Sequence, residues 1–412
     1  MTAGPADASP PADASRPAAP VTDPARLRRL GAADGAARDV IAGLLGQAVR
    51  GLPRMRHNQS GPFVFTMRGE PEGPTASGDA TRHRAVPAGR SLRYAAIVAL
   101  GARLLPPDEQ RAALGGQSAA ELTGTLLPRL AATGPDAVTS LGDIALVAWA
   151  AAETGHDGLP QALRRLAAAD RPGRGAVYTV DAAWVASALA AARDAGADPA
   201  AEHLERSRRR LLDGLRGRAL YTHEVGGRGL VPRYRAHVGC FADQVYPVQA
   251  LARLGDGEAV AAADRVAAAI CAAQGPGGQW WWHYDARTGG VVEGYPVYSV
   301  HQHAMAPMAL LDLAEAGGAD HLGAIARGVG WLAAPPETGE PLMPGDPVMT
   351  WRKVARRDPR KAVRGARAAT TLLRPGWRAA ALDRAFPPGA VDRECRPYEL
   401  GWLLYSWLED HA

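Results

Sequence analysis

The sequence has few cysteines, few lysines and no long unbroken apolar run. Its three thiols, Cys240, Cys271 and Cys395, are widely spaced, which excludes a disulfide framework. No window approaches the roughly 20 apolar residues of a membrane helix, so we expect a cytoplasmic protein without a transmembrane segment. Basic residues are almost all arginine, because Lys353 and Lys361 are the only lysines among the 412 residues.

The net charge is also small for a chain of this length. The net charge is +5, and the basic runs are short and interrupted, so we expect solvated surface and no nucleic-acid partner. Residues 1–27 are rich in Pro and Ala. They lack the basic start and apolar stretch of a signal peptide, and we expect them to form a disordered tail.

What the sequence has in quantity is helical periodicity. One kind of segment returns six times, with a polar start followed by about three turns of almost wholly apolar residues. A helix that is apolar on every side is buried on every side. The segments are SLRYAAIVALGARLL from 91, LGDIALVAWAAAE from 141, YTVDAAWVASALAAA from 178, CFADQVYPVQALARL from 240, YSVHQHAMAPMALLDL from 298 and RPYELGWLLYSWLED from 396.

Helices with one charged face, such as those near 200–217 and 256–274, alternate with these apolar segments. Six repeats of an outer and an inner helix describe an all-α (α/α)6 toroid, in which six parallel inner helices are wrapped by six outer ones. We therefore predict a single toroid domain over 28–412, with a basic excursion at about 352–380 between the last two inner helices.

Parallel inner helices would bring their polar starts to one mouth of the ring, where helix N-termini also favour anions. Helix capping is the alternative explanation for Asp143 and Asp181, but it does not explain paired histidines. Pro247 and Pro307 align sixty residues apart and mark helix starts, which places Asp243 and His303 at equivalent positions. The polar groups expected at the mouth are Arg93, Tyr94, Asp143, Asp181, Asp243, Gln244, His301, Gln302, His303 and Glu399.

The stretch QGPGGQWWWHYD, residues 274–285, follows an outer helix and leads toward an inner one. It resembles the QW motif of squalene cyclases, in which a helix-terminal Gln and a Trp after a Gly turn tie successive repeats together. By that resemblance, Gln274 would contact the next helix, and one of Trp280, Trp281 and Trp282 would stack against it. A structural role and a place in the pocket wall are both open for these rings.

The wider chain resembles the terpene cyclase and protein prenyltransferase toroids, and some uncharacterised bacterial toroid proteins. This resemblance implies an isoprenoid substrate in a cavity lined by Trp184, Trp402 and Tyr405, whose rings would stabilise a carbocation. The acidic motifs of both cyclase classes are missing. Prenyltransferases hold Zn²⁺ with Asp, Cys and a later His, and Cys240, Asp243 and His303 offer a similar set in a different order. No cofactor is required by the sequence, and Zn²⁺ and Mg²⁺ remain open.

Three functions remain compatible with the mouth. The resemblance favours an isoprenoid or prenyl-lipid enzyme, which we take as the main expectation. A carbohydrate-active toroid with paired carboxylates is the alternative, and a non-catalytic binding toroid is the third. The candidate acids and bases are Asp243, His301, His303, Glu399 and Asp285. The candidate substrate-binding residues are Arg93, Tyr94, Asp181, Gln244, Tyr246, Trp280, Trp282, His283, Tyr284, Tyr298, Gln302, Trp351, Arg352, Arg396 and Trp402.

Overall fold

The computed structural model describes residues 24–409, apart from 58–62, 72–82, 133, 135–136, 198–199, 345–348 and 359–360. Residues 1–23 of the predicted tail lie outside the described part. A helix already begins at Ala25 (α1, Ala25–Ala33), and its first turn includes a buried arginine, Arg26. The last four residues of the predicted tail therefore belong to the folded body.

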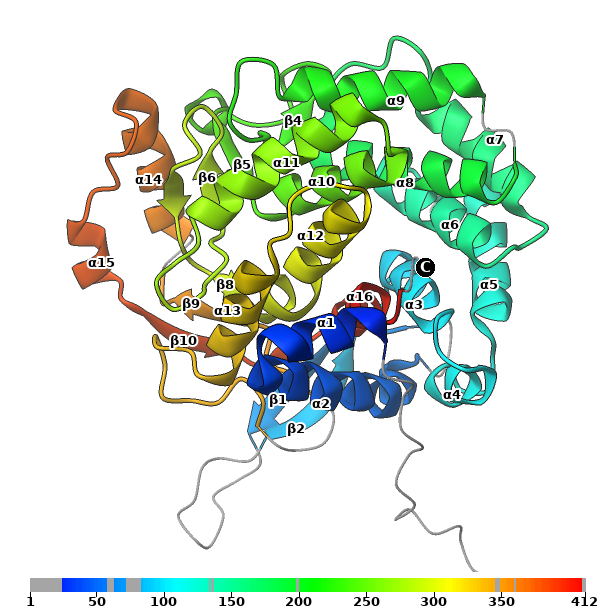
Figure 1. The fold of residues 1–412 in the computed structure, drawn as a ribbon, viewed down its shortest axis with the longest axis horizontal. Coiled ribbons are helices and arrows are strands. Elements are labelled where there is room, and N and C mark those ends of the chain that lie inside the picture. Colours follow the sequence, from blue (N-terminus) through cyan, green and yellow to red (C-terminus); the bar gives the residue numbers. More distant parts are fainter. Residues whose placement is uncertain are drawn as a thin grey trace, which may run out of the picture.

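In the described part of the chain, six inner helices form a closed ring, each beside the next and the last beside the first (Figure 1). Six outer helices alternate with them along the sequence, which confirms the predicted (α/α)6 toroid. The inner helices are α3 (Leu92–Ala102), α6 (Leu141–Glu153), α8 (Thr179–Asp194), α10 (Ala242–Leu254), α12 (Ala306–Glu315) and α16 (Pro397–Leu408). The outer helices are α2 (Gly35–Gly51), α5 (Ala119–Ala131), α7 (Leu159–Ala169), α9 (Ala201–Gly214), α11 (Gly257–Ala272) and α13 (Leu322–Ala333).

Further helices lie outside this alternating pattern. The region of the predicted basic excursion contains α14, which is fixed to the body because Glu293 accepts hydrogen bonds from Arg356 (3.1 Å) and Arg367 (2.9 Å). None of the described helices is both long and apolar enough to cross a bilayer. The additional helices are η1 (Leu52–Met55), α4 (Pro107–Ala113), η3 (Arg233–Arg235), α14 (Ala362–Leu373) and α15 (Ala381–Ala385).

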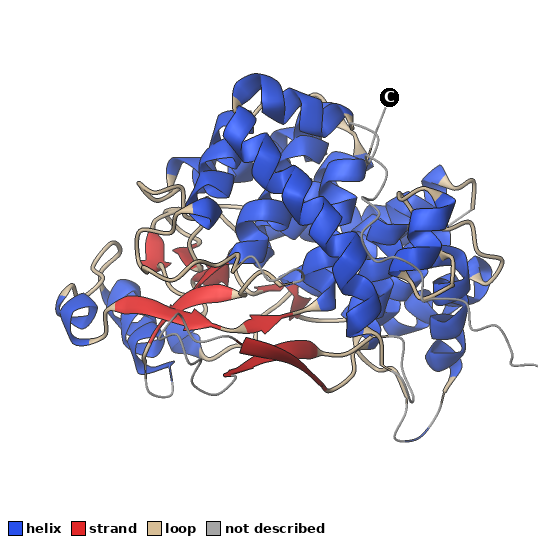
Figure 2. Cartoon of the chain, turned by 90° about the horizontal axis from the view of Figure 1, so that it is seen from below, coloured by secondary structure: helices blue, strands red, loops and turns tan. Residues whose placement is uncertain are grey.

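Short strands gather on one side of the helical body (Figure 2). They pair in the orders β11-β1-β2, β10-β9-β8, β3-β4 and β5-β6-β7. With two to six residues each, they are too short to show the alternation that identifies a strand in sequence. The strands are β1 (Thr66–Pro71), β2 (His83–Ala88), β3 (Val177–Tyr178), β4 (Glu224–Val225), β5 (Val238–Cys240), β6 (His283–Asp285), β7 (Val291–Glu293), β8 (Val297–Tyr298), β9 (Lys353–Arg356), β10 (Pro388–Asp392) and β11 (Glu394–Cys395).

The strands lie where the chain enters the ring. β2, β3, β5, β8 and β11 each precede an inner helix by a few residues or none. The small sheets therefore border the N-terminal end of the inner ring, and they tie the loops of different repeats together. One of them joins distant parts of the chain, because Met67 of β1 pairs with Cys395 of β11.

Aromatic side chains fill the centre of the ring. The ring centroids of Trp184 and Tyr246 lie 5.1 Å apart, those of Tyr246 and Trp402 lie 5.9 Å apart, and those of Trp402 and Trp149 lie 5.7 Å apart. Tyr405 meets both tryptophans of the last pair edge-on. All five side chains are buried, and such contacts contribute stability beyond their area. They form a packed floor beneath the N-terminal end.

The C-terminal end of the ring is filled by ion pairs. Glu153 bridges Arg103 (2.7 Å) and Arg253, and Arg103 also binds Glu409 (2.9 Å). These groups come from the ends of three helices, α3, α6 and α10, and from Glu409 just beyond α16. These ion pairs connect the helix ends, so they close the C-terminal end of the ring.

Of the two aligned prolines, only Pro307 lies in the first turn of its helix as predicted, because α12 begins at Ala306. α10 begins at Ala242, with Pro247 inside it, and α12 is preceded by a π-helical turn, His301–Met305 (η4). A proline cannot donate to the carbonyl four residues earlier, so Pro307 frees the carbonyl of His303. The indole nitrogen of Trp407 donates to that carbonyl at 2.7 Å, which satisfies the lost bond within the core.

Candidate active site

The N-terminal ends of the six inner helices meet at one mouth, as the sequence predicts. Each contributes a polar or charged group near its start. Arg93 is ion-paired with Asp143, and the charges of Asp143 and Asp243 both act on Asp181. On the other side, the loop residue Arg352 lies next to Glu399, and its charge also acts on His301. In ring order the six groups are Arg93, Asp143, Asp181, Asp243, His301 and Glu399.

Three carboxylates occupy one arc of this mouth. Arg93 donates to Asp143 at 2.6 Å, and both side chains are partly exposed. Ser140 caps α6, and no side chain caps α8, so neither Asp143 nor Asp181 serves as the helix cap that was the alternative explanation. A Cβ on Gly142 would lie 2.2 Å from Oδ1 of Asp181. The glycine therefore lets Asp181 pack directly against the start of α6.

Asp181 is the carboxyl group of this arc that is poised to exchange a proton. Burial raises its pKa to about 6, Arg93 opposes the rise, and the charges of Asp143 and Asp243 add to it. A carboxylic acid with a pKa close to working pH exists in both protonation states there, which is what acid–base catalysis requires. Its environment also matches the perturbed groups that mark functional sites.

Asp243 is held in place by a chain of hydrogen bonds. Its Oδ2 atom lies 2.6 Å from Nδ1 of His223 and accepts a hydrogen bond from the backbone N–H of Cys240 at 2.7 Å. The other imidazole nitrogen of His223, Nε2, lies 2.7 Å from Nη2 of Arg235. Because arginine can only donate, Nε2 accepts the hydrogen bond from Arg235. The ring proton therefore lies on Nδ1, which donates a hydrogen bond to Asp243.

Gln244 explains how His223 reaches this place. Its side chain accepts from the N–H of Tyr221 at 2.9 Å and donates to the carbonyl of the same residue at 3.0 Å. At the start of α8, Thr179 donates its hydroxyl to the carbonyl of Thr222 at 2.6 Å. The 221–223 segment is thus clamped between α8 and α10, so Gln244 positions His223 rather than facing the mouth.

The ligand types of a zinc site also meet here, with His223 in the place where the sequence suggested His303. Donor atoms of His223, Cys240 and Asp243 all lie within 4.8 Å of one another. A zinc-bound histidine uses a lone pair on one nitrogen and donates its other N–H to an acceptor. Arg235 beside Nε2 forces the opposite arrangement, and burial raises the pKa of the Cys240 thiol well above its usual value. The three residues therefore do not fit a metal.

We expect removal of divalent metals to leave this protein unchanged. After dialysis against a chelator, its melting temperature and turnover should stay within measurement error, because hydrogen bonds already satisfy the three side chains. Metal analysis and differential scanning calorimetry would check this. Stoichiometric zinc that raises the melting temperature, and is lost in His223→Ala, would contradict it.

Arginine and glutamate form the opposite side of the mouth. Nε of Arg352 lies 3.3 Å from Oε1 of Glu399 without good hydrogen-bond geometry. Burial raises the pKa of Glu399 to about 7, and the charge of Arg352 opposes the rise. Arg396 donates to the hydroxyl of Tyr94 at 3.1 Å and to Glu394 at 2.8 Å. This side therefore holds one guanidinium, that of Arg352, whose charge is incompletely neutralised, beside the paired Arg396.

Aromatic rings complete the wall. Trp282 lies parallel to His301 with centroids 5.8 Å apart, and its centroid is 4.8 Å from that of Tyr298. Arg352 sits over the face of Tyr298 at 4.7 Å, and Arg364 of α14 sits over Trp282 at 5.8 Å. Flat rings of this kind can pack against the apolar face of a planar or ring-shaped ligand.

The three consecutive tryptophans have different surroundings. Trp280 is fully buried against Phe241, with centroids 5.6 Å apart. Trp281 covers the Gly turn, since a Cβ on Gly275 would lie 2.3 Å from its ring. Only Trp282 of these three belongs to the mouth. The helix-terminal Gln274 donates to the carbonyl of Ala324 in α13 at 2.9 Å, so this segment also ties two outer helices together.

Two of the histidines at and near the mouth, His301 and His283, are neutral. Burial lowers the pKa of His301 to about 3, helped by the charge of Arg352, and burial lowers that of His283 well below its usual value. His303 makes none of the ring contacts with Trp282 and Tyr298 that His301 makes. It is buried, burial lowers its pKa to about 3, and its backbone carbonyl accepts a hydrogen bond from Trp407 of α16.

Several other predicted residues also lie away from the mouth. Asp285 is bound by Arg287 at 2.7 Å, and Arg287 in turn donates to the carbonyl of Thr371 in α14. Gln302 donates to the carbonyl of Tyr298 and accepts from the N–H of Trp280. These side chains fix segments of the wall.

The remaining aromatic candidates belong to the core. Tyr284 is fully buried. Trp351 packs over β1, where a Cβ on Gly69 would lie 2.8 Å from its ring. Tyr246 and Trp402 lie in the packed floor beneath the acidic arc. Residues that the sequence did not single out, His223, Arg235, Arg364 and Tyr398, supply much of the mouth's remaining chemistry.

No protein-family model matches this chain, and no curated protein sequence matches it. Solved structures share its fold at low identity. An unsaturated glucuronyl hydrolase specific for heparin aligns with a TM-score of 0.52 and 13% identity, over 91% of this chain and 96% of its own. A sugar epimerase from a ruminal bacterium aligns with a TM-score of 0.54 and 11% identity, over 89% and 98%. An unsaturated glucuronyl hydrolase from Bacillus sp. GL1 aligns with a TM-score of 0.50 and 13% identity, over 90% and 96%.

These similarities correct the main functional expectation. The toroid fold is right, but the similar structures are glucuronyl hydrolases and a sugar epimerase, so the terpene-cyclase and prenyltransferase interpretation is wrong. The physical reason is visible in the ring. Trp402 and Tyr405, expected to line an apolar cavity, pack against each other and Trp149, while the mouth above carries charges that an isoprenoid chain cannot use.

Proposed function

We propose that this protein is a carbohydrate-active enzyme that performs acid–base chemistry on a sugar bound at the mouth. The observation that carries this proposal is Asp181, a partly exposed carboxyl group with a pKa raised to about 6 beside two further carboxylates. Sugar chemistry commonly uses a protonated acid together with a second, ionised carboxylate. The sugar-processing enzymes with the same fold support the substrate class, although fold alone never determines function.

In this proposal Asp181 donates the proton. Asp243 is the ionised partner, since hydrogen bonds from His223 and the N–H of Cys240 stabilise its negative charge. It stabilises positive charge that develops on the sugar ring, or it orients water for attack. Trp282 and Tyr298 offer flat surfaces to the ring.

The charges opposite the acidic arc favour a sugar that carries an acidic group. Arg352 is mostly buried, and its contact with Glu399 is not a good hydrogen bond. A carboxylate from a ligand would give this guanidinium the bidentate partner that it lacks. Two of the similar structures are unsaturated glucuronyl hydrolases. Oligosaccharides with an unsaturated glucuronyl group are therefore the first substrates to test.

The test is an activity screen followed by a pH profile. The purified protein is incubated with unsaturated glucuronyl disaccharides and with neutral reducing disaccharides, and products are separated by chromatography and mass spectrometry. If Asp181 acts as an acid, kcat/KM should fall tenfold for each pH unit once the pH is well above about 6, because only the protonated form works. Turnover of neither substrate class, with glycans bound but unchanged, would favour a non-catalytic binding protein instead.

A further inference from the structure

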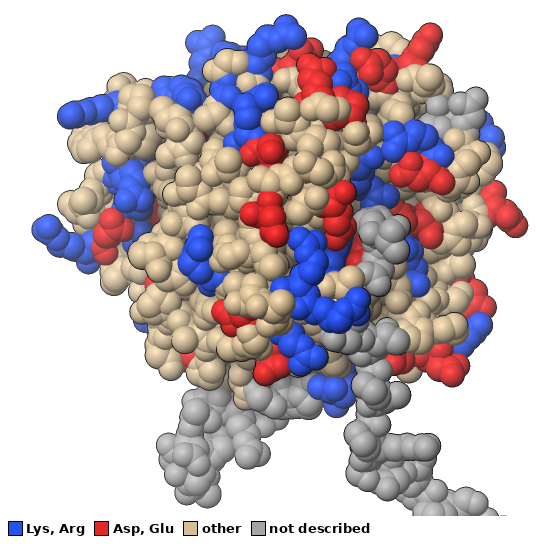
Figure 3. All heavy atoms as spheres, in the orientation of Figure 1, with Lys and Arg blue, Asp and Glu red and all other residues tan. Residues whose placement is uncertain are grey.

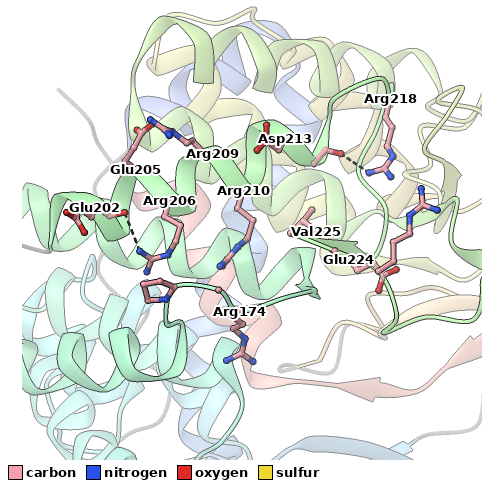
Figure 4. A pocket seen from close by; sticks show the side chains of 16 residues that line it. Arg174, Glu202, Glu205, Arg206, Arg209, Arg210, Asp213, Arg218, Glu224 and Val225 are labelled. Carbon is pink, nitrogen blue, oxygen red and sulfur yellow. Dashed lines mark hydrogen bonds and ion pairs between the residues drawn. The ribbon is translucent and has the colours of Figure 1, made fainter.

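A pocket lined by arginines, and also by Glu202, Glu205, Asp213 and Glu224, lies on the outer side of the ring. Its volume is about 860 Å³, and it is bounded by α9, the 172–174 segment and the 224–228 loop. Figure 4 shows Arg206 and Arg210 reaching from α9 toward the 172–174 segment. A volume of this size falls within the range of small-molecule and oligosaccharide sites.

Four arginines of this pocket have no carboxylate partner among the described residues. Arg174 and Arg218 donate to the backbone carbonyls of Ala169 and Gly214, and Arg206 donates to the carbonyls of Glu202 and Asp170. Arg228 is exposed on the 224–228 loop. Carbonyl contacts hold a guanidinium in place without cancelling its charge, so these groups are free to bind anions.

The other arginines of the same helix are neutralised, which makes the contrast informative. Arg209 binds Glu205 at 2.6 Å, and Arg210 binds Asp170 at 2.9 Å. Just beyond α9, Arg216 binds Asp213 at 2.8 Å. On the face of the molecule shown in Figure 3, basic and acidic side chains are interspersed. The four arginines of the pocket are therefore distinguished by their lack of a carboxylate partner in the described part of the chain, not by a high density of basic residues.

This pocket leads toward the mouth. An adjoining pocket of about 450 Å³ shares Gly173 and Arg174 with it and extends to Thr139. Thr139 directly precedes Ser140, which accepts a hydrogen bond from Arg93 at 3.2 Å. The charge of Arg174 also acts on Asp181. A chain that leaves the mouth beside Asp143 would therefore pass Arg174 and reach the larger pocket.

Two glycines bring the walls together at this point. A Cβ on Gly227 would lie 2.9 Å from the backbone nitrogen of Ala176, and Gly227 has a φ of +156°. A Cβ on Gly226 would lie 3.6 Å from Nε of Arg210 and 3.5 Å from the carbonyl of Gly175. β3 and β4 pair next to them, through Val177 and Val225. The pocket floor is thus built by close backbone contact.

We propose that the pocket lined by Arg174, Arg206, Arg218 and Arg228 is an extended subsite for an acidic oligosaccharide, which holds the anionic groups of sugars that lie outside the mouth. The proposal rests on the proposed function and deepens it, because it makes the substrate a polyanionic chain rather than a single sugar. Guanidinium groups bind carboxylates and sulfates bidentately, and the spread of four of them suits repeated charges.

The test compares two charge-matched double variants by isothermal titration calorimetry. The ligand is a defined hexasaccharide in which every second sugar is a uronic acid. Arg206→Gln/Arg228→Gln should weaken binding at least about tenfold, since two charge-assisted contacts are lost. Arg29→Gln/Arg216→Gln, with the same change in charge at arginines that are already paired and lie outside the pocket lining, should stay within about twofold of the parent. Equal affinity of the parent and the first double variant would overturn the subsite, as would failure of the parent to bind the hexasaccharide.

Two further measurements separate this inference from the proposed activity. Asp181→Asn should bind the hexasaccharide as tightly as the parent, and binding without turnover would reject the activity while supporting the subsite. Where turnover is found, Arg206→Gln/Arg228→Gln should raise KM for the hexasaccharide about tenfold and leave a disaccharide unaffected. A DNA oligonucleotide of equal charge that binds equally well, and is lost in the same variant, would overturn the glycan assignment.

Discussion

Asp181→Asn is expected to lower kcat/KM by about 10³-fold on any sugar that the parent turns over. Asparagine has the shape of the carboxyl group, but it has no proton with a pKa near 6 to give. Steady-state kinetics with the best substrate from the activity screen would measure the loss. A variant that retains more than about a tenth of parent activity would show that the proton comes from another group.

The same helix offers a matched control. Asp194 lies at the C-terminal end of α8, half exposed, and its ion pair is with the adjacent Arg193. Asp194→Asn makes the same chemical change in the same helix, far from the mouth, and activity should stay within about twofold of the parent. If both variants lose activity together, the effect of Asp181→Asn reflects damage to α8 rather than loss of an acid.

Stability should move in the opposite direction to activity. Burial raises the pKa of Asp181 in the folded chain to about 6 from an ordinary value of 3.8, so folding disfavours the charged form. This penalty is absent below about pH 4 and complete above about pH 6. Asp181→Asn should therefore melt higher than the parent at pH 8 and at the same temperature near pH 4, as expected where a site is maintained at the expense of stability.

The architecture could be predicted because each inner helix is recognisable in the sequence as an almost wholly apolar segment. α6 is buried at every position from Leu141 to Ala152 except Asp143, and a wholly apolar helix has only one place in a small protein. The shared mouth followed from the parallel direction of such helices. The short strands could not be predicted, because two or three residues such as Val297–Tyr298 carry no period.

The mouth itself was only partly predictable, and His303 shows why. Alignment of Pro247 with Pro307 makes His303 equivalent to Asp243, but the π-helical turn His301–Met305 inserts one residue before the second helix. One residue rotates the following side chains by about 100° around the axis. His301 therefore stacks on Trp282, while His303 is buried without a ring contact to Trp282 or Tyr298.

His223 shows a different limit. It lies in a loop between an outer and an inner helix, without periodicity or spacing to mark it. It reaches Asp243 only because Gln244 and Thr179 bind the backbone on its N-terminal side. Contacts of this kind come from tertiary structure, and a single sequence does not reveal them. The family resemblance erred for a related reason, since a helix-terminal Gln and a Trp-containing turn suit any ring of stacked helix pairs.

Gly101→Ala is expected to destabilise the protein by about 3 kcal/mol, because it lies where α3 crosses α16 and the ring closes. A Cβ on Gly101 would lie 2.0 Å from the carbonyl oxygen of Gly401. In the reverse direction, a Cβ on Gly401 would lie 2.7 Å from the carbonyl oxygen of Ile97. Both obstacles are helix backbone, which cannot move aside as a flexible side chain can, so the two helices must separate.

Urea titration followed by circular dichroism would measure the change, with Gly330→Ala as the control. Gly330 lies on the exposed side of α13, and no atom lies within 4 Å of a Cβ placed there. Alanine is the better helix former at an unobstructed position, so this variant should gain about 0.5–1 kcal/mol. The same substitution thus has opposite signs at the two sites. An unchanged unfolding midpoint for Gly101→Ala would mean that α3 and α16 do not meet as closely as the closed ring requires.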